Sequence, residues 1–170
     1  MVEEHDHEYR TGIGTDIHKL VEGRKLVLGG CKVPFNKGLL GHSDGDVVIH
    51  AVIDALLGAA SMGDIGTLYP DTDPLFKDAD STDLLRDVRD RLEDLRWIIV
   101  NIDLIIHLEQ PRLELVKAQI KRSVASILGI DFNAVNVKAK TNEGLGPIGT
   151  GEAIACTAAV LIKRKYKRTL

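Results

Sequence analysis

The stretch from Gly41 to Gly66 constrains the fold more than any other part of the chain. It begins as a polar, glycine-bearing turn and becomes apolar and rich in alanine, with hydrophobic residues recurring at helical spacing from Val47 onward. Ser43 or Asp44 is placed to cap a helix by accepting hydrogen bonds from backbone N–H groups two or three residues further on. The pattern therefore predicts a packed helix over residues 43–60.

Three titratable side chains share one stripe of this predicted helix. Asp46, His50 and Asp54 are spaced four residues apart, so they project from about the same side of the helix. A packed helix has no structural need for several such groups, and burying them unpaired would be costly. We therefore expect a cation in front of the stripe.

An upstream pattern offers further ligands for this cation. Residues two apart in an extended strand face the same side, so Asp16 and His18 present an oxygen and a nitrogen together. With His50 they make two histidines and one carboxylate, and catalytic zinc sites commonly have three protein ligands and one open position. Taken alone, the Asp-x-His pair is weak evidence for a metal and more often the half-exposed end of a strand, and a single helical histidine is more often a core residue.

Length and composition indicate one globular domain. The chain has 170 residues, of which 44% are hydrophobic and 28% charged. A net charge of −3 argues against a broad nucleic-acid-binding surface, and the apolar run at residues 153–162 is about half the length needed to span a membrane. No secretory signal is visible, and two cysteines do not make a disulfide framework. We expect a cytoplasmic protein with no nucleic-acid or membrane partner.

Strand-like and helical segments are mixed along the chain without an internal repeat, which favours an α+β layer fold. We expect a flexible extension over residues 1–9, the folded domain over residues 10–165 and a basic tail over residues 166–170. The expected strands are residues 10–18, 25–28, 32–35, 97–108, 134–140 and 152–163, and the later helices are residues 82–95, capped by Ser81, and a segment opened by Pro111 and ended by Gly129.

Two loops have compositions that suit ligand binding. Residues 71–77 combine carboxylates, a hydroxyl and an ammonium group, although turn chemistry around a proline explains the same residues. Residues 140–146 place Lys140, the Thr141 hydroxyl and backbone amides where phosphate oxygens could bind, and Glu143 could hold a hard divalent ion; a solvated turn is the default for this loop by itself. No Walker A or Rossmann fingerprint is present, so neither a P-loop kinase nor a nicotinamide enzyme is indicated.

Together these pieces closely resemble one family, the 2-C-methyl-D-erythritol 2,4-cyclodiphosphate synthases of the non-mevalonate (MEP) isoprenoid pathway. The resemblance covers about residues 10 to 163, and its central run is highly specific. Such an extended match outweighs the low specificity of its parts. The matching residues are Asp16, His18, the run 38–46, His50, the runs 54–58, 63–66 and 70–74, Phe76, Lys77, Asp80, Ser81, the run 135–139, Thr141 and Glu143.

The resemblance implies a single α+β domain with a mixed β-sheet and helices layered on one face, assembling as a homotrimer around the sheets. It implies a lyase that converts 4-diphosphocytidyl-2-C-methyl-D-erythritol 2-phosphate to 2-C-methyl-D-erythritol 2,4-cyclodiphosphate. In this reaction the 2-phosphate attacks the β-phosphorus and CMP leaves. Such a phosphoryl transfer needs alignment and charge neutralisation more than an acid or a base.

The same resemblance assigns two metal ions. Asp16, His18 and His50 would bind zinc, one ion per subunit, and Glu143 would hold Mg²⁺ or Mn²⁺ with the diphosphate of the substrate. The implied catalytic residues are Asp16, His42, Thr141 and Glu143.

The resemblance also places the substrate between two subunits. His42 and Ser43 would belong to a mobile flap over the methylerythritol part, with Asp64 and Asp71 near its hydroxyls, and residues 108–113 would form the cytidine pocket of the neighbouring subunit. The implied substrate-binding residues are His42, Ser43, Asp64, Gly66, Asp71, Thr72, Asp73, Phe76, Lys77, Leu108, Lys140 and Thr141.

The chain departs from the family pattern at two positions. The family often has threonine where Lys140 stands, so the diphosphate contacts of this loop are expected to differ. The family also often has an arginine at the position of Thr150, near the trimer axis, where it is associated with an inner cavity for isoprenoid diphosphates. The resemblance therefore does not extend to isoprenoid binding at the axis.

Two other functions remain compatible with the residues. A zinc-dependent phosphohydrolase would use the same three ligands to activate water, and a non-enzymatic trimer would hold a structural metal. The lack of an obvious fourth ligand argues against a closed structural site. The hydrolase and the cyclase differ in their product, which the sequence does not show.

Overall fold

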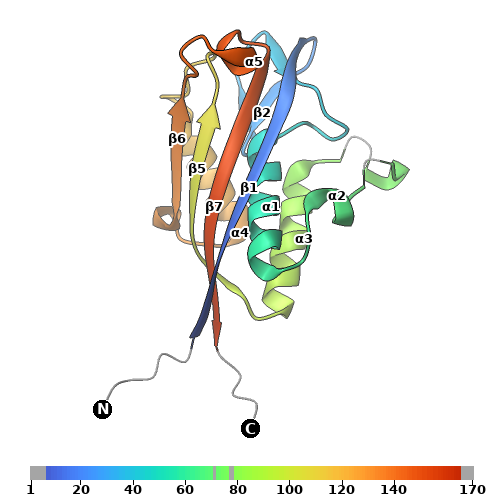
Figure 1. Cartoon of the computed structure of the whole chain (residues 1–170), viewed down its shortest axis with the longest axis vertical. Helices are drawn as coiled ribbons and strands as arrows, with labels where there is room; N and C mark the ends of the chain where they lie inside the picture. The colour runs from blue at the N-terminus through green and yellow to red at the C-terminus, as the bar shows by residue number, and fades with distance from the viewer. Residues whose placement is uncertain (1–6, 71, 77–78, 166–170) are drawn as a thin grey trace.

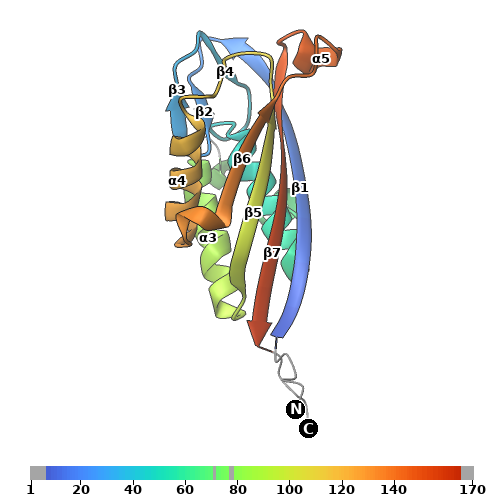
Figure 2. The ribbon, with the colours of Figure 1, turned by 90° about the vertical axis from the view of Figure 1, so that its left-hand side faces the viewer.

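A single mixed sheet organises the chain, for which a computed structural model describes residues 7–70, 72–76 and 79–165. The strand order is β4-β1-β7-β5-β6; β5 and β6 are parallel and the other pairs are antiparallel. The three longer helices lie on one face of this sheet (Figures 1 and 2). The predicted α+β class is therefore confirmed. The five strands are β1 (His7–Glu22), β4 (Lys37–Leu39), β5 (Ile98–His107), β6 (Val135–Lys140) and β7 (Ala153–Lys165).

Three longer helices form the second layer. α1 (Val47–Ala60) packs against β1 and β7, and α3 (Ser81–Asp94) and α4 (Lys117–Leu128) complete the layer (Figure 1). Among the described residues, no helix has the length and hydropathy needed to cross a bilayer. The shorter elements are the β2–β3 hairpin (Leu26–Leu28 and Cys31–Val33), α2 (Ile65–Leu68), α5 (Gly146–Gly149) and the 3₁₀ turns η1 (Pro74–Phe76) and η2 (Phe132–Ala134).

The first strand is longer than the sequence pattern predicts. β1 pairs with β7 from His7 opposite Lys165 to Lys19 opposite Ala153, so residues 7–9 belong to the sheet although we assigned them to an extension. Pairing with β7 satisfies the backbone hydrogen-bonding groups of residues 7–9, and the sequence pattern of these residues alone does not reveal that partner. Residues 1–6 and the tail at 166–170 lie outside the described residues.

Helix starts are the least accurately predicted features. The N-cap of α1 is Asp46 rather than Ser43 or Asp44, and the N-cap of α3 is Asp80 rather than Ser81. α4 begins at Lys117, well after Pro111, because residues 108–116 form a loop before the helix. Its predicted end is correct, since Gly129 takes the left-handed conformation after Leu128.

Two glycines allow α1 to lie directly on β1. Gly12 and Gly14 face the helix, and a Cβ at either position would overlap backbone atoms of α1, the carbonyl oxygen of Ala55 or of Ala51. The backbone of β1 and the backbone of α1 therefore approach more closely than any side chain would permit. This contact places the β1 residues that follow Gly14 beside the first turns of α1.

We expect Gly14→Ala to lower the free energy of unfolding by about 3 kcal/mol, because the added methyl meets backbone, which cannot move as a side chain can. Gly58→Ala is the control: Gly58 lies within α1 with open space around its Cβ position. That variant should gain about 0.5 to 1 kcal/mol from helix propensity. Urea denaturation at one protein concentration measures both, and equal stability of the two variants would contradict the close approach.

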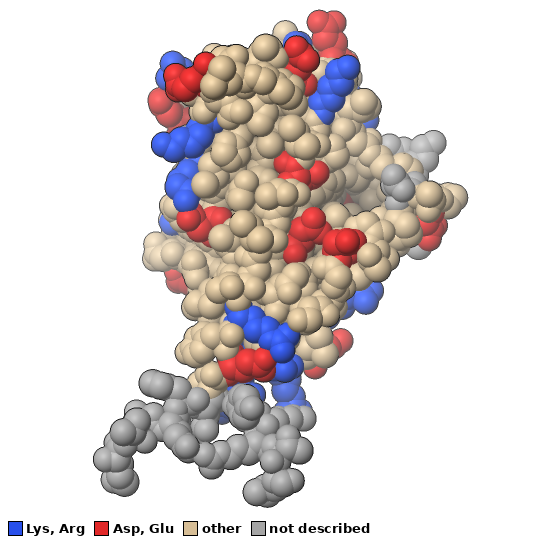
Figure 3. All heavy atoms as spheres, viewed as in Figure 1, with Lys and Arg blue, Asp and Glu red and all other residues tan. Residues whose placement is uncertain are grey.

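The face of the sheet opposite the helices carries exposed apolar side chains. Tyr9, Ile13 and Ile17 of β1 are 55%, 71% and 54% exposed. Figure 3 views this face and shows wide areas without charged groups. Apolar side chains exposed along one strand make this face a candidate interaction surface.

Candidate metal and phosphate site

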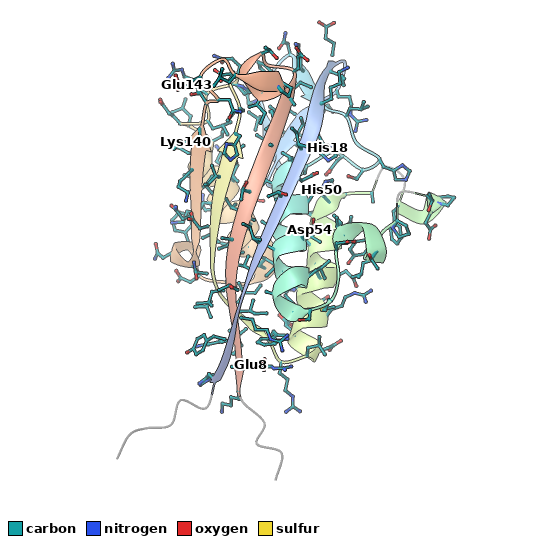
Figure 4. The ribbon with its side chains drawn as sticks, in the orientation of Figure 1. Glu8, His18, His50, Asp54, Lys140 and Glu143 are labelled. Carbon is teal, nitrogen blue, oxygen red and sulfur yellow. The ribbon has the colours of Figure 1, made fainter. Side chains whose placement is uncertain are left out.

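The most distinctive feature of the site is a cluster of one carboxylate and two imidazoles. Asp16 and His18 come from β1 and His50 from the first turn of α1, and both histidines face the gap between strand and helix (Figure 4). Oδ2 of Asp16 lies 2.9 Å from Nε2 of His18 and 2.9 Å from Nδ1 of His50. The two imidazole nitrogens are 3.1 Å apart. Within the described part of the chain, this is the only such group of three with metal-ligand spacing.

The electrostatics of the cluster favour a bound cation. Burial disfavours the charged form of Asp16, but hydrogen bonds and charge from His18 and His50 outweigh it and hold the pKa of Asp16 well below its usual value. Burial also lowers the pKa of His50, but the hydrogen bond and charge of Asp16, together with the charges of Asp46 and Asp44, outweigh burial and raise that pKa. The carboxylate thus favours a positive charge at the position between the three ligand atoms of Asp16, His18 and His50.

The donor set fits a zinc ion with an open coordination position. Two nitrogens and one carboxylate oxygen converge, as in catalytic zinc sites, which keep a position for water or substrate. The side chains of Asp16, His18 and His50 remain 24%, 20% and 12% exposed, so the cluster is reachable from solvent. The three residues that the sequence grouped are therefore brought together by the fold.

Asp46 does not face this cluster, so the prediction of a cation in front of the whole helical stripe is wrong for this residue. Its carboxylate is fully buried and accepts hydrogen bonds from four backbone N–H groups. Two are in the first turn of α1, and two belong to Gly29 and Gly30 in the β2–β3 hairpin, at 2.8 and 2.6 Å. As the N-cap, Asp46 lies outside the helical spacing that the prediction assumed.

Asp54 has a different structural role, one turn further along α1 than His50. Its Oδ1 accepts a hydrogen bond of 2.8 Å from the backbone N–H of Ile65, which holds the start of α2 against α1. Burial, together with the nearby charge of Asp64, raises the pKa of Asp54. Of the three stripe residues, only His50 contributes to the cluster.

The turn before α1 brings a hydroxyl to the cluster. Ser43 is buried, and its Oγ lies 3.1 Å from Nε2 of His50. His42, the preceding residue, is exposed. The two predicted flap residues therefore lie beside the cluster, one facing it and one facing solvent, and their contact with substrate remains a prediction.

The connection after α1 carries the next group of predicted substrate-binding residues. Asp64 caps α2 by accepting hydrogen bonds from the backbone N–H and hydroxyl of Thr67, both at 2.8 Å, and these bonds lower its pKa. Phe76 packs edge-to-face on Tyr69 at 5.4 Å between ring centroids. Gly66 lies within α2, Thr72 is exposed and Asp73 is half-buried, whereas Asp71 and Lys77 lie outside the described residues.

The predicted phosphate-binding residues form a second group at the end of β6. The Thr141 hydroxyl donates to Oε1 of Glu143 at 2.6 Å, and Glu143 has a positive φ of 52°. Glu109, which lies in the segment expected to form the cytidine pocket, also holds this loop by accepting from the backbone N–H groups of Asn142 and Gly144 at 2.8 and 3.4 Å. Beside the loop is a cavity of about 260 Å³, lined by residues 108–114, Lys117 and residues 139–141.

One chain does not bring the two groups together. Along one row of the sheet, Ile17 of β1 pairs with Ala155, while Ala155 pairs with His107, which pairs with Lys140 of β6. The cluster and the loop therefore lie at about the same level along the strands, but β7 and β5 separate the strand of the cluster, β1, from the strand of the loop, β6 (Figure 4). Three strand spacings of about 4.8 Å separate them by roughly 14 Å.

Comparison with known proteins identifies the family. The model of the YgbB family matches residues 9–163. A 2-C-methyl-D-erythritol 2,4-cyclodiphosphate synthase of Neisseria gonorrhoeae is 52% identical over 155 residues, which cover 91% of this chain and 97% of that protein. The chain belongs to the YgbB family of cyclodiphosphate synthases. The synthase of Treponema denticola is 49% identical over 153 residues, covering 90% of this chain and 95% of that protein.

Solved structures of YgbB-family proteins share the fold. The Plasmodium falciparum protein IspF, in a complex with CDP, is 34% identical, with a TM-score of 0.81 over 96% of this chain and 100% of that one. The bifunctional IspDF of Campylobacter jejuni is 42% identical, with a TM-score of 0.90 over 93% of this chain. This chain spans 43% of that bifunctional protein, so the second match concerns one part of it. The family resemblance seen in the sequence is confirmed.

The two departures from the YgbB-family pattern have clear positions. Lys140 ends β6 and is exposed beside the Thr141 loop. The Thr150 hydroxyl is held by the carbonyl oxygen of Gly146, at 3.2 Å, and by Oε1 of Glu152, at 3.0 Å. A neutral side chain engaged in this way offers no positive charge to an anion, and weak isoprenoid diphosphate binding at this position remains a prediction.

Proposed function

We propose that this chain converts 4-diphosphocytidyl-2-C-methyl-D-erythritol 2-phosphate to 2-C-methyl-D-erythritol 2,4-cyclodiphosphate and CMP. The observation that carries the proposal is the solvent-accessible convergence of Asp16, His18 and His50 in a chain about half identical to named synthases over nearly its whole length. The reaction forms a bond between an oxygen of the 2-phosphate and the β-phosphorus. It breaks the bond from that phosphorus to the oxygen that leaves with CMP.

Asp16, His18 and His50 would hold a zinc ion, and Glu143 would hold Mg²⁺ or Mn²⁺. When bound, these cations would neutralise the phosphate oxygens of the transition state. Thr141 and the backbone amides of its loop would position the diphosphate, and Ser43 with the flap would cover the methylerythritol part. The proposed mechanism needs no side chain as a strong acid or base, because phosphoryl transfer depends on positioning and charge neutralisation.

The cavity beside the Thr141 loop is the proposed site of the cytidine part. Its lining combines the buried side chains of Leu108 and Leu113 with backbone groups of the loop, which suits a planar base next to a diphosphate. Two solved structures of relatives, one of them the Plasmodium falciparum IspF, are complexes with CDP. Lys140 would add positive charge next to the phosphates, at the place where the family often has threonine.

The uncovered sheet face supports a homotrimer with the sheets facing the three-fold axis. Apolar side chains of β1 and the small Ala155 and Ala159 of β7 lie on this face, so sheets of neighbouring copies could approach closely. A closed ring would also bring the β6 side of one copy to the β1 side of the next. The catalytic site would then lie at each subunit interface.

Cys31 and Cys156 are free, which suits a reducing cytoplasm, the compartment we propose.

Phosphorus NMR tests the proposed reaction. Incubation of the protein with the cytidine substrate, zinc and Mg²⁺ should yield a cyclic diphosphate and CMP in equal amounts. The variant Asp16→Asn should yield neither, because one of the three proposed zinc ligands is weakened. Release of linear products, with water as the acceptor, would instead identify a phosphohydrolase, and no turnover by the wild-type protein would refute both.

A further inference from the structure

A fully buried hydroxyl lies behind the metal cluster and is used by no step of the proposed reaction. Ser81 is the first residue of α3, with 0% of its surface exposed. Its Oγ lies 2.9 Å from Nε2 of His50 and 2.5 Å from Oδ1 of Asp44. The backbone N–H of Ser81 also donates to Oδ2 of Asp44, at 3.3 Å. Residues from three separate segments thus meet in one hydrogen-bonded chain.

The protons in this chain can be assigned by counting donors. A carboxylate accepts hydrogen bonds and has none to donate, so the single proton of the Ser81 hydroxyl goes to Asp44. The Ser81 oxygen can then only accept from His50. Nε2 of His50 therefore carries a proton, which leaves Nδ1 as the nitrogen with the lone pair whenever the imidazole is neutral, as a metal ligand must be.

This tautomer is the one that zinc binding needs. Nδ1 is the nitrogen of His50 that faces the cluster, 2.9 Å from Oδ2 of Asp16 and 3.1 Å from Nε2 of His18. A protonated Nδ1 could not coordinate a metal ion. Metal-binding histidines commonly donate their second N–H to an acceptor that fixes the tautomer and the ring orientation.

We propose that the Asp44–Ser81–His50 chain is a positioning relay, which fixes His50 in the Nε2-protonated tautomer so that Nδ1 faces the zinc position. Asp44 and Ser81 are positioning residues, because neither reaches the cluster and both act through His50. The inference rests on the zinc site of the proposed function. It also links the turn before α1 to the start of α3, since Asp44 comes from that turn.

Ser43 is a weaker acceptor for the same proton. Its Oγ is 3.1 Å from Nε2 of His50, but it already accepts from the backbone N–H of Gly45 at 3.3 Å. Ser81 is closer, and the first turn of a long helix holds it in place. The relay therefore assigns the main orienting role to Ser81.

The test measures zinc affinity, by competition with a chromophoric chelator and without substrate. Ser81→Ala should bind zinc about 10- to 100-fold more weakly than wild type, the usual loss for an outer hydrogen-bond partner. Ser81→Thr keeps the hydroxyl and should recover most of the affinity. Thr82→Ala should leave it unchanged, because the Thr82 hydroxyl bonds to Arg86 on the exposed side of α3. His50→Gln, which lacks the ligand, gives the reference for complete loss.

Non-additivity distinguishes a relay from general damage. Asp44→Ala frees the Ser81 proton to point at His50 and should itself weaken zinc binding about tenfold or more. The double variant Asp44→Ala/Ser81→Ala should then be no weaker than Ser81→Ala, because both changes remove the same orientation. Full additivity would overturn the relay.

Histidine ¹⁵N NMR of zinc-loaded wild type tests the tautomer directly, and it decides the matter if Ser81→Ala does not fold. A proton on Nε2 of His50 is expected, and a proton on Nδ1 would overturn the inference. Unchanged zinc affinity in folded Ser81→Ala, or no zinc binding by wild type, would overturn it as well. If zinc binds as described but no cyclic diphosphate forms, the relay stands and the proposed reaction fails.

Discussion

Asp16→Asn and Glu143→Ala chains, each inactive as its own trimer, should regain about a quarter of wild-type activity when equal amounts are unfolded and refolded together. The reason is the arrangement of the sheet. Asp16 lies on β1 and Glu143 follows β6, with β7 and β5 between these strands. A chain that damages one group therefore keeps the other intact for a neighbour.

The expected fraction follows from counting junctions in a ring of three. A junction is active when the chain supplying the metal cluster has an intact Asp16 and the chain supplying the loop has an intact Glu143. With random mixing each condition holds for half of the chains, so about one junction in four is active. Every mixed ring contains one such junction, whichever variant is in the majority.

Wild type taken through the same unfolding and refolding sets the full scale, and each variant refolded alone sets the background. Distinct charge tags on the two variants allow native mass spectrometry to verify that mixed trimers form. If mixed trimers form and remain inactive, both groups act within a single chain and the interface site is wrong. If the protein is not trimeric at all, the assembly proposal fails before activity is measured.

Asp46→Ala should lower the free energy of unfolding by about 3 to 5 kcal/mol, because it leaves four backbone N–H groups, three of them buried, without their acceptor. The carboxylate joins the β2–β3 hairpin to the first turn of α1, so its loss affects both. Burial disfavours the charged form of Asp46 and raises its pKa. The backbone hydrogen bonds from Gly30, Gly29 and Ile49 stabilise the carboxylate and counteract part of this effect.

Asp80→Ala is the matched control for this prediction. Asp80 is also the N-cap of a helix of 14 residues, but it is exposed, and among the described residues its side chain accepts only from the backbone N–H of Thr82. Its loss should cost about 1 kcal/mol, as for an ordinary cap. Urea denaturation of both variants measures the difference, and similar losses would show that the hairpin contacts of Asp46 contribute little.

The local patterns in the chain predicted the elements well where the pattern and the environment agree. The apolar periodicity of residues 47–60 predicted α1, and Gly29-Gly30 predicted the β2–β3 hairpin. The Asp-x-His spacing predicted two ligands on one side of β1, because alternation along a strand is a local property. These features require no knowledge of what lies across the fold.

The sequence patterns were less informative where a polar side chain can make several different hydrogen bonds, such as a helix cap or a contact with another segment. The sequence predicted Ser43 or Asp44 as the cap of the first helix and Ser81 as the cap of the next, because each has the right chemistry for a cap. In the structure Asp46 caps α1, Asp80 caps α3, and Ser81 bonds to His50 instead. The contact between Glu109 and the Thr141 loop was not predicted, because the backbone groups that Glu109 binds lie across the β5–β6 pair, at sequence positions more than thirty residues away.

The sequence by itself determined the family, the α+β class and the identity of the three clustered side chains, because motif spacing and hydrophobic periodicity are properties of the chain alone. Tertiary structure decided which atoms meet. Close packing of α1 on Gly12 and Gly14 brings His50 to Asp16, and the burial of Ser81 gives His50 its second partner. The strand order separates the Thr141 loop from the cluster. Such contacts join segments far apart in sequence, so only the packing of the whole domain specifies them.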